Sequence, residues 1–364
     1  MRGIVANGND EKLMPSVSSS SSTAADIIDL TPTGFKLKTS DTDYNGNNDK
    51  IIYMAIRRPD GYVGKPADAG TDVFAMDTGN NSSTIPAYDS GFPVDFALMK
   101  KPASTFDWYT GARLTGSKYM KTNSTTAGAT ANAWLFDSNA GWSTGQDTDR
   151  QSWMWKRHAG FDVVTYKGNG VAGRQIPHSM NKTPEMIWIR AISGGEWIVG
   201  HHGVNGGTNP WNYEMLLHDT RGEGASANKF NNTAPNSRVF TVGDNTYVNA
   251  SGTNYVSMLF SSVSGISSVG SYTGNGSTTG PIITTGFQPR LIMLKRADDS
   301  GSWYLYDTLR GITSGNDHRI ELNGNYGQSS GADDVDVLST GFQLKHTWDN
   351  LNGSGCKYLY NAHA

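Results

Sequence analysis

Short apolar runs alternate with clusters of Gly, Asn, Ser and Thr along most of the chain. Three of these runs share a pattern, in which a proline precedes an uninterrupted apolar stretch that ends in a basic residue. They are GFPVDFALMKK from Gly91, NKTPEMIWIR from Asn181 and GFQPRLIMLKR from Gly286. A short continuous apolar run is typical of a fully buried strand, and proline is tolerated in its first residues. The pattern therefore predicts three equivalent buried strands, which follow Pro93, Pro184 and Pro289.

Further signals recur at matching distances from these runs, which indicates an internal repeat. Each run is preceded by a Gly-Asn turn and followed by a strand that carries a tryptophan. The turns begin at Gly79, Gly168 and Gly274, and the tryptophans are Trp108, Trp197 and Trp303. A hairpin with Gly and Asn in its connection closes the repeat. We expect three whole units at residues 61–160, 161–264 and 265–364, which are called units 1, 2 and 3 below.

Each unit is expected to contain roughly six to nine short strands, because turn residues recur about every 8 to 12 positions. This spacing is typical of an antiparallel sandwich, and no amphipathic helix stands out. The sequence thus predicts an all-β chain of tandem antiparallel β-sandwich repeats of the jelly-roll type. The linkers between the units are short, which favours a rigid string of domains over freely jointed ones.

Residues 1–60 match only the second half of a unit, and they are called the half unit below. The sequence GFKLKTSDTDYNGNNDKIIYMAI from Gly34 corresponds to the closing hairpin that begins at Gly341. A half sandwich leaves a sheet edge or face without a partner. Three explanations stay open: the chain begins upstream of Met1, another subunit supplies the missing strands by β-augmentation, or the N-terminus packs independently or is disordered.

Composition excludes several classes of partner. The net charge is -3 and the pI is about 6.2, whereas nucleic acid and anionic membranes attract clustered Lys and Arg. From this charge we expect no nucleic-acid partner. No apolar run of membrane-span length is present, so we also expect no membrane insertion. The single cysteine, Cys356, excludes an intrachain disulfide. No signal peptide is visible, so an extracellular location would be reached by lysis or as part of a particle.

Acidic residues do not form a close motif, and they occupy unlike positions in the units. We therefore expect no enzyme activity and no catalytic residues, since hydrolysis of a glycan needs two carboxylates held across a cleft. Asp307 and Arg310, in the string YDTLRG, are expected to form an ordering ion pair near a strand end.

One loop of the half unit has the start of a calcium-binding pattern. Oxygen-bearing side chains occupy its first, third, fifth and ninth positions, and Gly46 occupies the sixth. These candidate ligands are Asp41, Asp43, Asn45 and Asp49. The twelfth position, where the pattern needs Glu, is Ile52, and an Asn-Gly turn explains the loop without an ion. Calcium is the one cofactor that the sequence suggests, and the turn stays open beside it.

Aromatic residues provide the candidates for a binding surface. The repeated tryptophans either fill the space between sheets or stack on sugars, and both interpretations stay open for Trp197. Trp211 and Tyr213 lie in NGGTNPWNYEM, a Gly- and Asn-rich loop that interrupts the repeat. Loops of this kind often carry binding residues. We predict that Trp211 and Tyr213 are exposed, and that ligand contacts come from Trp197, Trp211 and Tyr213.

The strings GFQPRLIMLKRADDSGSWYLYDTLRG and STGFQLKHTWDNLNGSGCKYLYNA resemble a repeat domain of tail and fibre proteins of marine and other bacteriophages. That domain is in turn similar to the concanavalin-like and laminin-G-like sandwiches. The resemblance is good over 265–364, fair over 161–264 and weaker over 61–160. It implies no catalytic residues, and it implies a virion or extracellular location.

From this resemblance we expect a non-enzymatic virion structural protein, such as a tail fibre, appendage or decoration protein. Its role would be host-surface contact or particle architecture, with multivalent contacts in a homo-oligomer. Its partners would be other virion or filament subunits and a host-surface glycan. Two alternatives stay open: a lectin-like carbohydrate-binding protein, and an extracellular filament subunit that assembles by strand complementation.

Overall fold

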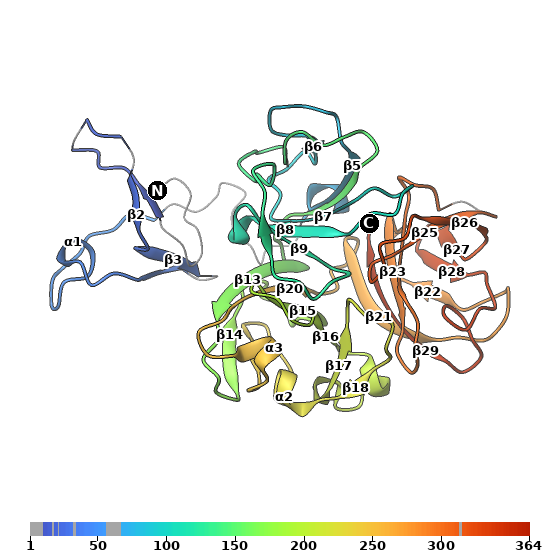
Figure 1. Ribbon diagram of the computed structural model, residues 1–364. Coiled ribbons are helices and arrows are strands. Elements are labelled where there is room, and N and C mark those ends of the chain that lie inside the picture. Colours follow the sequence, from blue (N-terminus) through green and yellow to red (C-terminus); the bar gives the residue numbers. More distant parts are fainter. Residues whose placement is uncertain (1–9, 17, 21, 32–33, 56–66, 313–314) are drawn as a thin grey trace.

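The structure, a computed structural model, describes residues 10–16, 18–20, 22–31, 34–55, 67–312 and 315–364 (Figure 1). Its regular structure is dominated by antiparallel strands, which confirms the predicted all-β sandwich fold. The helices in these residues have three or four residues each. They are α1 (Thr42–Asn45), α2 (Ala227–Phe230), α3 (Thr246–Asn249), η1 (Gly70–Asp72), η2 (Arg113–Thr115), η3 (Val204–Gly207) and η4 (Pro210–Asn212). In the described part of the chain, no helix has the length and apolar character to cross a membrane.

Unit 1 consists of a six-stranded sheet and a small two-stranded sheet. The order in the large sheet is β10-β9-β8-β7-β12-β5, and the small sheet pairs β11 with β6. The strands are β5 (Phe74–Thr78), β6 (Tyr88–Asp89), β7 (Phe96–Lys100), β8 (Tyr109–Ala112), β9 (Lys118–Lys121), β10 (Ala129–Thr130), β11 (Gly141–Trp142) and β12 (Gln151–Trp155).

Unit 2 repeats this arrangement. Its large sheet has the order β13-β20-β15-β16-β17-β18, and its small sheet pairs β14 with β19. The strands are β13 (Phe161–Lys167), β14 (Arg174–Pro177), β15 (Met186–Ala191), β16 (Ile198–His201), β17 (Tyr213–Leu216), β18 (Gly224–Ala225), β19 (Val239–Val242) and β20 (Asn254–Phe260).

Unit 3 has the same large sheet and a small sheet of three strands. The orders are β21-β29-β23-β24-β25-β26 and β22-β28-β27. The strands are β21 (Ser267–Thr273), β22 (Ile282–Thr284), β23 (Leu291–Arg296), β24 (Trp303–Asp307), β25 (Asp317–Glu321), β26 (Ser329–Ala332), β27 (Val335–Leu338), β28 (Gly341–Leu344) and β29 (Lys357–His363).

The strands that follow Pro93, Pro184 and Pro289 occupy one equivalent position in the three sheets, as the sequence pattern predicts. In each case the proline-led strand (β7, β15 or β23) lies between the last strand of the unit and the strand that carries or directly follows the repeated tryptophan. The first strand of the unit pairs with the other edge of the last strand. The last strand (β12, β20 or β29) is therefore enclosed on both sides.

The central strands of each large sheet are buried on both faces, which explains the uninterrupted apolar runs. In β15, Met186 and Trp188 belong to a central core that all three units share, whereas Ile187 and Ile189 belong to the sandwich core of unit 2. The sandwich cores of units 3 and 1 form in the same way against their own small sheets.

The three units surround this central core, and each contacts the other two (Figure 1). The sequence-based expectation of a rigid string of domains is therefore wrong for units 1 to 3. The physical reason is the second apolar face of each large sheet, which can be buried only when the sheets pack against one another.

The described part of the half unit has the hairpins of the second half of unit 3. Its strands are β1 (Asp10–Lys12), β2 (Ser22–Ala25), β3 (Ile28–Thr31) and β4 (Gly34–Leu37). β1 pairs with β2 as β25 pairs with β26, with the same spacing and the same local irregularity. β3 and β4 pair as β27 and β28 do. The expected boundary between residues 60 and 61 lies outside the described residues.

Candidate functional site

The repeated tryptophans join the units to one another. Each indole is buried, and its Nε1–H donates a hydrogen bond to a backbone carbonyl at the end of β9, β17 or β25 in a neighbouring unit. The bonds run from Trp108 to Glu321 (2.6 Å), from Trp197 to Lys121 (2.7 Å) and from Trp303 to Leu216 (2.8 Å). Unit 1 thus donates to unit 3, unit 3 to unit 2 and unit 2 to unit 1, so the three bonds close a ring.

A buried cation lies beside each of these tryptophans, at the basic end of the proline-led strand. Lys100, Arg190 and Lys295 have no solvent-exposed surface. Each donates to a backbone carbonyl of the unit that its neighbouring tryptophan contacts. The acceptors are Asn325 for Lys100 (3.2 Å), Thr126 for Arg190 (2.6 Å) and Thr220 for Lys295 (3.0 Å).

Burial lowers the pKa of all three basic side chains. Loss of hydration lowers the pKa of Lys295 to about 7, that of Lys100 to about 8 and that of Arg190 to about 10. Hydrogen bonds to backbone carbonyls replace part of the lost hydration, while Nε and Nη1 of Arg190 are buried without a hydrogen-bond partner. Lys295, for example, also donates to the carbonyls of Arg296 and Gly301.

Two reciprocal backbone hydrogen bonds complete each junction. They connect the loop after the proline-led strand of one unit with the loop after β9, β17 or β25 of a neighbouring unit. In the first set, Gln328 donates to Pro102 (2.6 Å), Gly128 to Ile192 (2.8 Å) and Glu223 to Ala297 (2.7 Å). In the second set, Phe106 donates to Asn325 (2.8 Å), Gly195 to Thr125 (2.9 Å) and Gly301 to Thr220 (2.8 Å). The three junctions are thus built from equivalent parts.

Asp307 adds a further connection between units 3 and 1. Arg310 pairs with its carboxylate at 2.7 Å, as the sequence predicts. The same buried carboxylate accepts from Trp153 Nε1 at 3.0 Å and from Gln151 Nε2 at 3.3 Å. This arrangement uses the acidic group to hold two units together.

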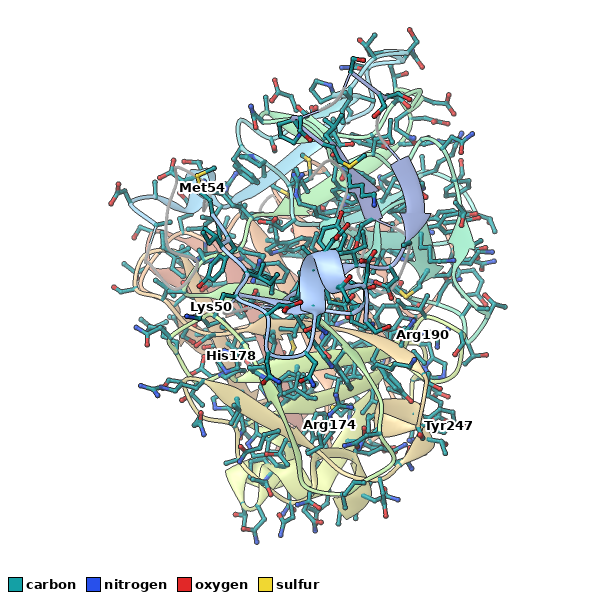
Figure 2. The ribbon with its side chains drawn as sticks, turned by 90° about the vertical axis from the view of Figure 1, so that its left-hand side faces the viewer. Lys50, Met54, Arg174, His178, Arg190 and Tyr247 are labelled. Carbon is teal, nitrogen blue, oxygen red and sulfur yellow. The ribbon has the colours of Figure 1, made fainter. Side chains whose placement is uncertain are left out.

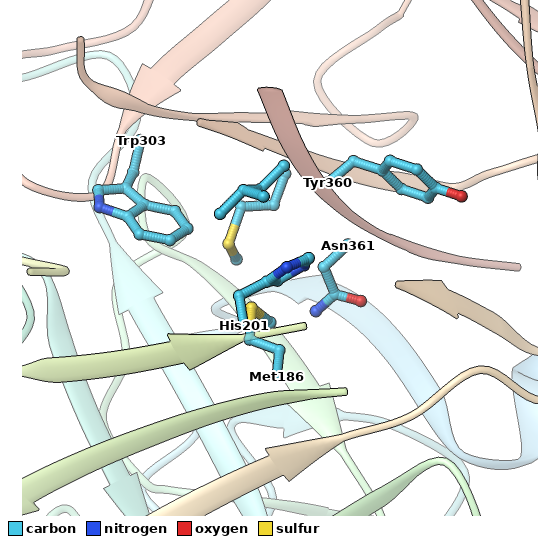
Figure 3. Close-up of a pocket in the computed structure, with 7 residues that line it drawn as sticks. Met186, His201, Trp303, Tyr360 and Asn361 are labelled. Carbon is cyan, nitrogen blue, oxygen red and sulfur yellow. The ribbon is translucent and has the colours of Figure 1, made fainter. Parts of the chain in front are cut away.

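A small pocket lies between units 2 and 3 (Figure 3). Met186 and His201 enter it from β15 and β16, opposite Trp303 and Asn361 of unit 3. Burial holds the pKa of His201 well below its usual value, so this imidazole is neutral near pH 7. The pocket leaves no room for a water-sized sphere. It is a packing defect at the junction and offers no space for a substrate.

The predicted ligand contacts do not form a common exposed surface. Trp197 belongs to the central core. Trp211 is only 5% exposed, so the prediction that it is exposed is wrong. Its short helix η4 turns the indole into the sandwich core of unit 2, where its ring centroid lies 5.3 Å from that of Phe230. Tyr213 is half-buried against the central core. Ligand binding by these three residues stays a prediction.

The predicted calcium ligands have another local role. Asp41 caps α1 by accepting a hydrogen bond from the backbone N–H of Asp43. Asn245 caps α3 of unit 2 in the same manner, so the loop geometry forms there with a neutral residue. In the described ranges no group of three or more His, Cys, Asp or Glu is placed to hold a metal. Calcium binding by Asp41, Asp43, Asn45 and Asp49 stays a prediction.

Sequence reasoning missed the role of the buried cations. Each proline-led run ends in Lys or Arg, and this shared basic residue was the available signal. It was not recognised, because a basic residue at the end of a strand is usually exposed to solvent. Only the closed packing of the three units shows that these ends are inside the molecule.

No curated protein matches the chain, and no solved structure does. One protein family matches residues 109–364, from the first residue of β8 through units 2 and 3 to Ala364. The match covers most of the chain and includes the tryptophans and cations of units 2 and 3. The chain therefore belongs to this family, which is described as a domain of unknown function (DUF7483).

Proposed function

We propose that the protein is a non-enzymatic structural protein of a virion appendage, such as a tail fibre or decoration protein. Its role is host-surface contact or particle architecture. The sequence resemblance to phage tail and fibre repeats motivates the location, and the construction of the three units supports a mechanical role. No catalytic step is part of the proposal.

The observation that carries the proposal is that the repeated polar and aromatic side chains are buried and join the three units to one another. The buried cations Lys100, Arg190 and Lys295 and the buried carboxylate of Asp307 form contacts within and between units. A closed ring of three sheets with a common core resists local opening, because the central strands of each sheet are buried on both faces. Such a rigid body suits a component that must transmit load or hold a fixed spacing.

A carbohydrate-binding function is less well supported, because stacking on a sugar requires an exposed aromatic face. Trp197 and Trp211 are buried. Assembly by strand complementation is favoured by a specific observation on the half unit, which is developed below.

Quantitative mass spectrometry of gradient-purified particles tests the proposed function. The culture must be one that produces this chain, and the particles are treated with protease and salt before they are analysed. We expect the chain to be retained at a fixed ratio to the major particle proteins. Its loss from particles at moderate salt, or its presence only in the soluble fraction, would contradict a structural role in the virion.

A further inference from the structure

Residues 51–55 of the half unit expose an apolar segment. Ile52 is 98% exposed, Met54 is 85% exposed, Tyr53 is also largely open to solvent, and Ile51 is 45% exposed. The segment is not paired in a sheet. In Figure 2, Met54 lies at the outer surface of the molecule. Four large apolar side chains in succession are an unusual feature of a soluble surface.

The equivalent segment of unit 3 is completely enclosed. By the alignment of the closing hairpins, residues 51–55 correspond to residues 358–362 of β29, where Leu359 is 2% and Asn361 is 1% exposed. β29 lies between β21 and β23 in the sheet. The equivalent strands β12 and β20 are enclosed in the same way in units 1 and 2.

An aromatic contact of the half unit holds this segment in the orientation of β29. The rings of Phe35 and Tyr53 meet edge to face, with centroids 5.2 Å apart and an interplanar angle of 79°. The equivalent rings of Phe342 and Tyr360 are 5.7 Å apart at the same angle of 79°. The segment thus lies against its hairpin as β29 does, without the two strands that flank β29 in unit 3.

A buried carboxylate fixes the hairpins of the half unit in the manner of unit 3. Asp10 accepts hydrogen bonds from the backbone N–H groups of residues 27 and 28, at 2.8 and 2.7 Å. Asp317 does the same for residues 334 and 335, at 2.7 and 2.8 Å. The strand pairing places Ser117 and Asn212 at this position in units 1 and 2. The half unit is therefore of the unit 3 type.

We propose that the half unit is an acceptor site for the missing first half of a unit 3-type repeat. The occupant is a polypeptide segment that provides counterparts of β21 to β24, and it comes from outside residues 1–364. No described strand of the chain is free for this task, because β5, β7, β13, β15, β21 and β23 already pair with β12, β20 and β29.

The acceptor determines the character of its occupant. Alternate residues of a strand face opposite sides, so Ile52 and Met54 lie on one face and Ile51 and Tyr53 on the other. The flanking strand in the position of β23 is therefore expected to be apolar on both faces, as the sequence LIMLKR of β23 is, whereas the strand in the position of β21 can carry small polar residues, as SSVGSYT does. Residues 265–309 of unit 3, which contain β21 to β24, are the appropriate probe.

The direct test adds a fluorescent polypeptide with the sequence of residues 265–309 to the full chain and measures its anisotropy. We expect saturable binding at micromolar concentration, and at least a tenfold loss of affinity in the double variant Ile52→Asp, Met54→Asp. The exposed apolar Val171 provides the matched control, and Val171→Asp should bind like the parent. Equal binding by both variants, or no binding, would argue against the acceptor site.

A second measurement does not depend on the solubility of the probe. A chain with residues 265–309 duplicated before Met1 should slow hydrogen exchange at residues 51–55 by at least tenfold relative to the parent chain. Unchanged exchange there would overturn the proposal. Concentration-dependent self-association of the parent chain that also protects residues 51–55 would assign the site to a second copy, and would likewise overturn it.

Discussion

The half unit and unit 3 contain the same hairpins in different surroundings. Asp10 and Asp317 hold the same turns, and Phe35 and Phe342 make the same edge-to-face contact. Yet Phe342 is fully buried, whereas Phe35 is only partly covered. Local hydrogen bonds and turns therefore set the shape of the hairpins, while the strands of the first half of the repeat supply their burial.

Truncation of the two equivalent phenylalanines should give the largest difference in stability between the half unit and unit 3. Phe342→Ala should lower the free energy of unfolding of the three-unit ring by about 3 to 5 kcal/mol, because it leaves a cavity in the core of unit 3. Phe35→Ala should change it by less than about 0.5 kcal/mol, since a partly exposed residue outside the ring is removed. Urea unfolding followed by tryptophan fluorescence measures both. Similar losses in the two variants would show that the half unit is packed into the ring.

His158 and His363 are two of the buried histidines through which acid should destabilise the ring. Burial lowers the pKa of His158 and of His363 to about 3. The unfolded chain binds these protons near pH 6.5, so the free energy of unfolding falls as the pH drops below that value. At pH 5 the loss is about 2 kcal/mol for each histidine. Asp317, whose pKa burial raises to about 6, partly opposes this loss.

The variant His363→Phe isolates one of these contributions. Phe260 occupies the equivalent position in unit 2, so the ring size suits the site. His363 Nε2 accepts from Trp155 Nε1, so the variant should be less stable than the parent at pH 8, by about 1 kcal/mol. Its stability should nevertheless decline less between pH 7.5 and pH 5. An unchanged pH dependence in urea titrations would refute the assignment to His363.

The junction hydrogen bonds can be separated from the packing of the indole rings. Trp197→Phe removes the donor to the carbonyl of Lys121 as well as ring volume. Trp188→Phe removes similar volume in the same unit, but its Nε1 has no hydrogen-bond partner. We expect Trp197→Phe to cost about 1 to 2 kcal/mol more than Trp188→Phe, because it leaves a buried carbonyl unpaired. Equal losses in thermal unfolding would mean that the junction bond contributes nothing.

The smallest effect is expected on the exposed segment of the half unit. Without an occupant, Ile52→Asp and Met54→Asp should change the thermal midpoint of the ring by no more than an ordinary surface substitution does. Differential scanning calorimetry of the full chain measures this. A large decrease would show that these side chains pack against the ring.

Much of the fold followed from the sequence because strands, turns and repeats are encoded locally. Pro93, Pro184 and Pro289 mark equivalent strands, and the hairpins of the half unit could be matched to unit 3. The closure of the ring could not be predicted, because the pattern of one strand shows that both faces are buried but not what covers them. Trp211 was misjudged for a related reason, since η4 folds a polar loop back over the core of unit 2.

Hydrogen exchange of the full chain in the absence of any partner tests the central claim, that one strand of the repeat is enclosed three times and left open once. The account predicts slow exchange throughout β12, β20 and β29, and rates near those of an unfolded peptide at residues 51–55. Protection of residues 51–55 equal to that of β29 would contradict it.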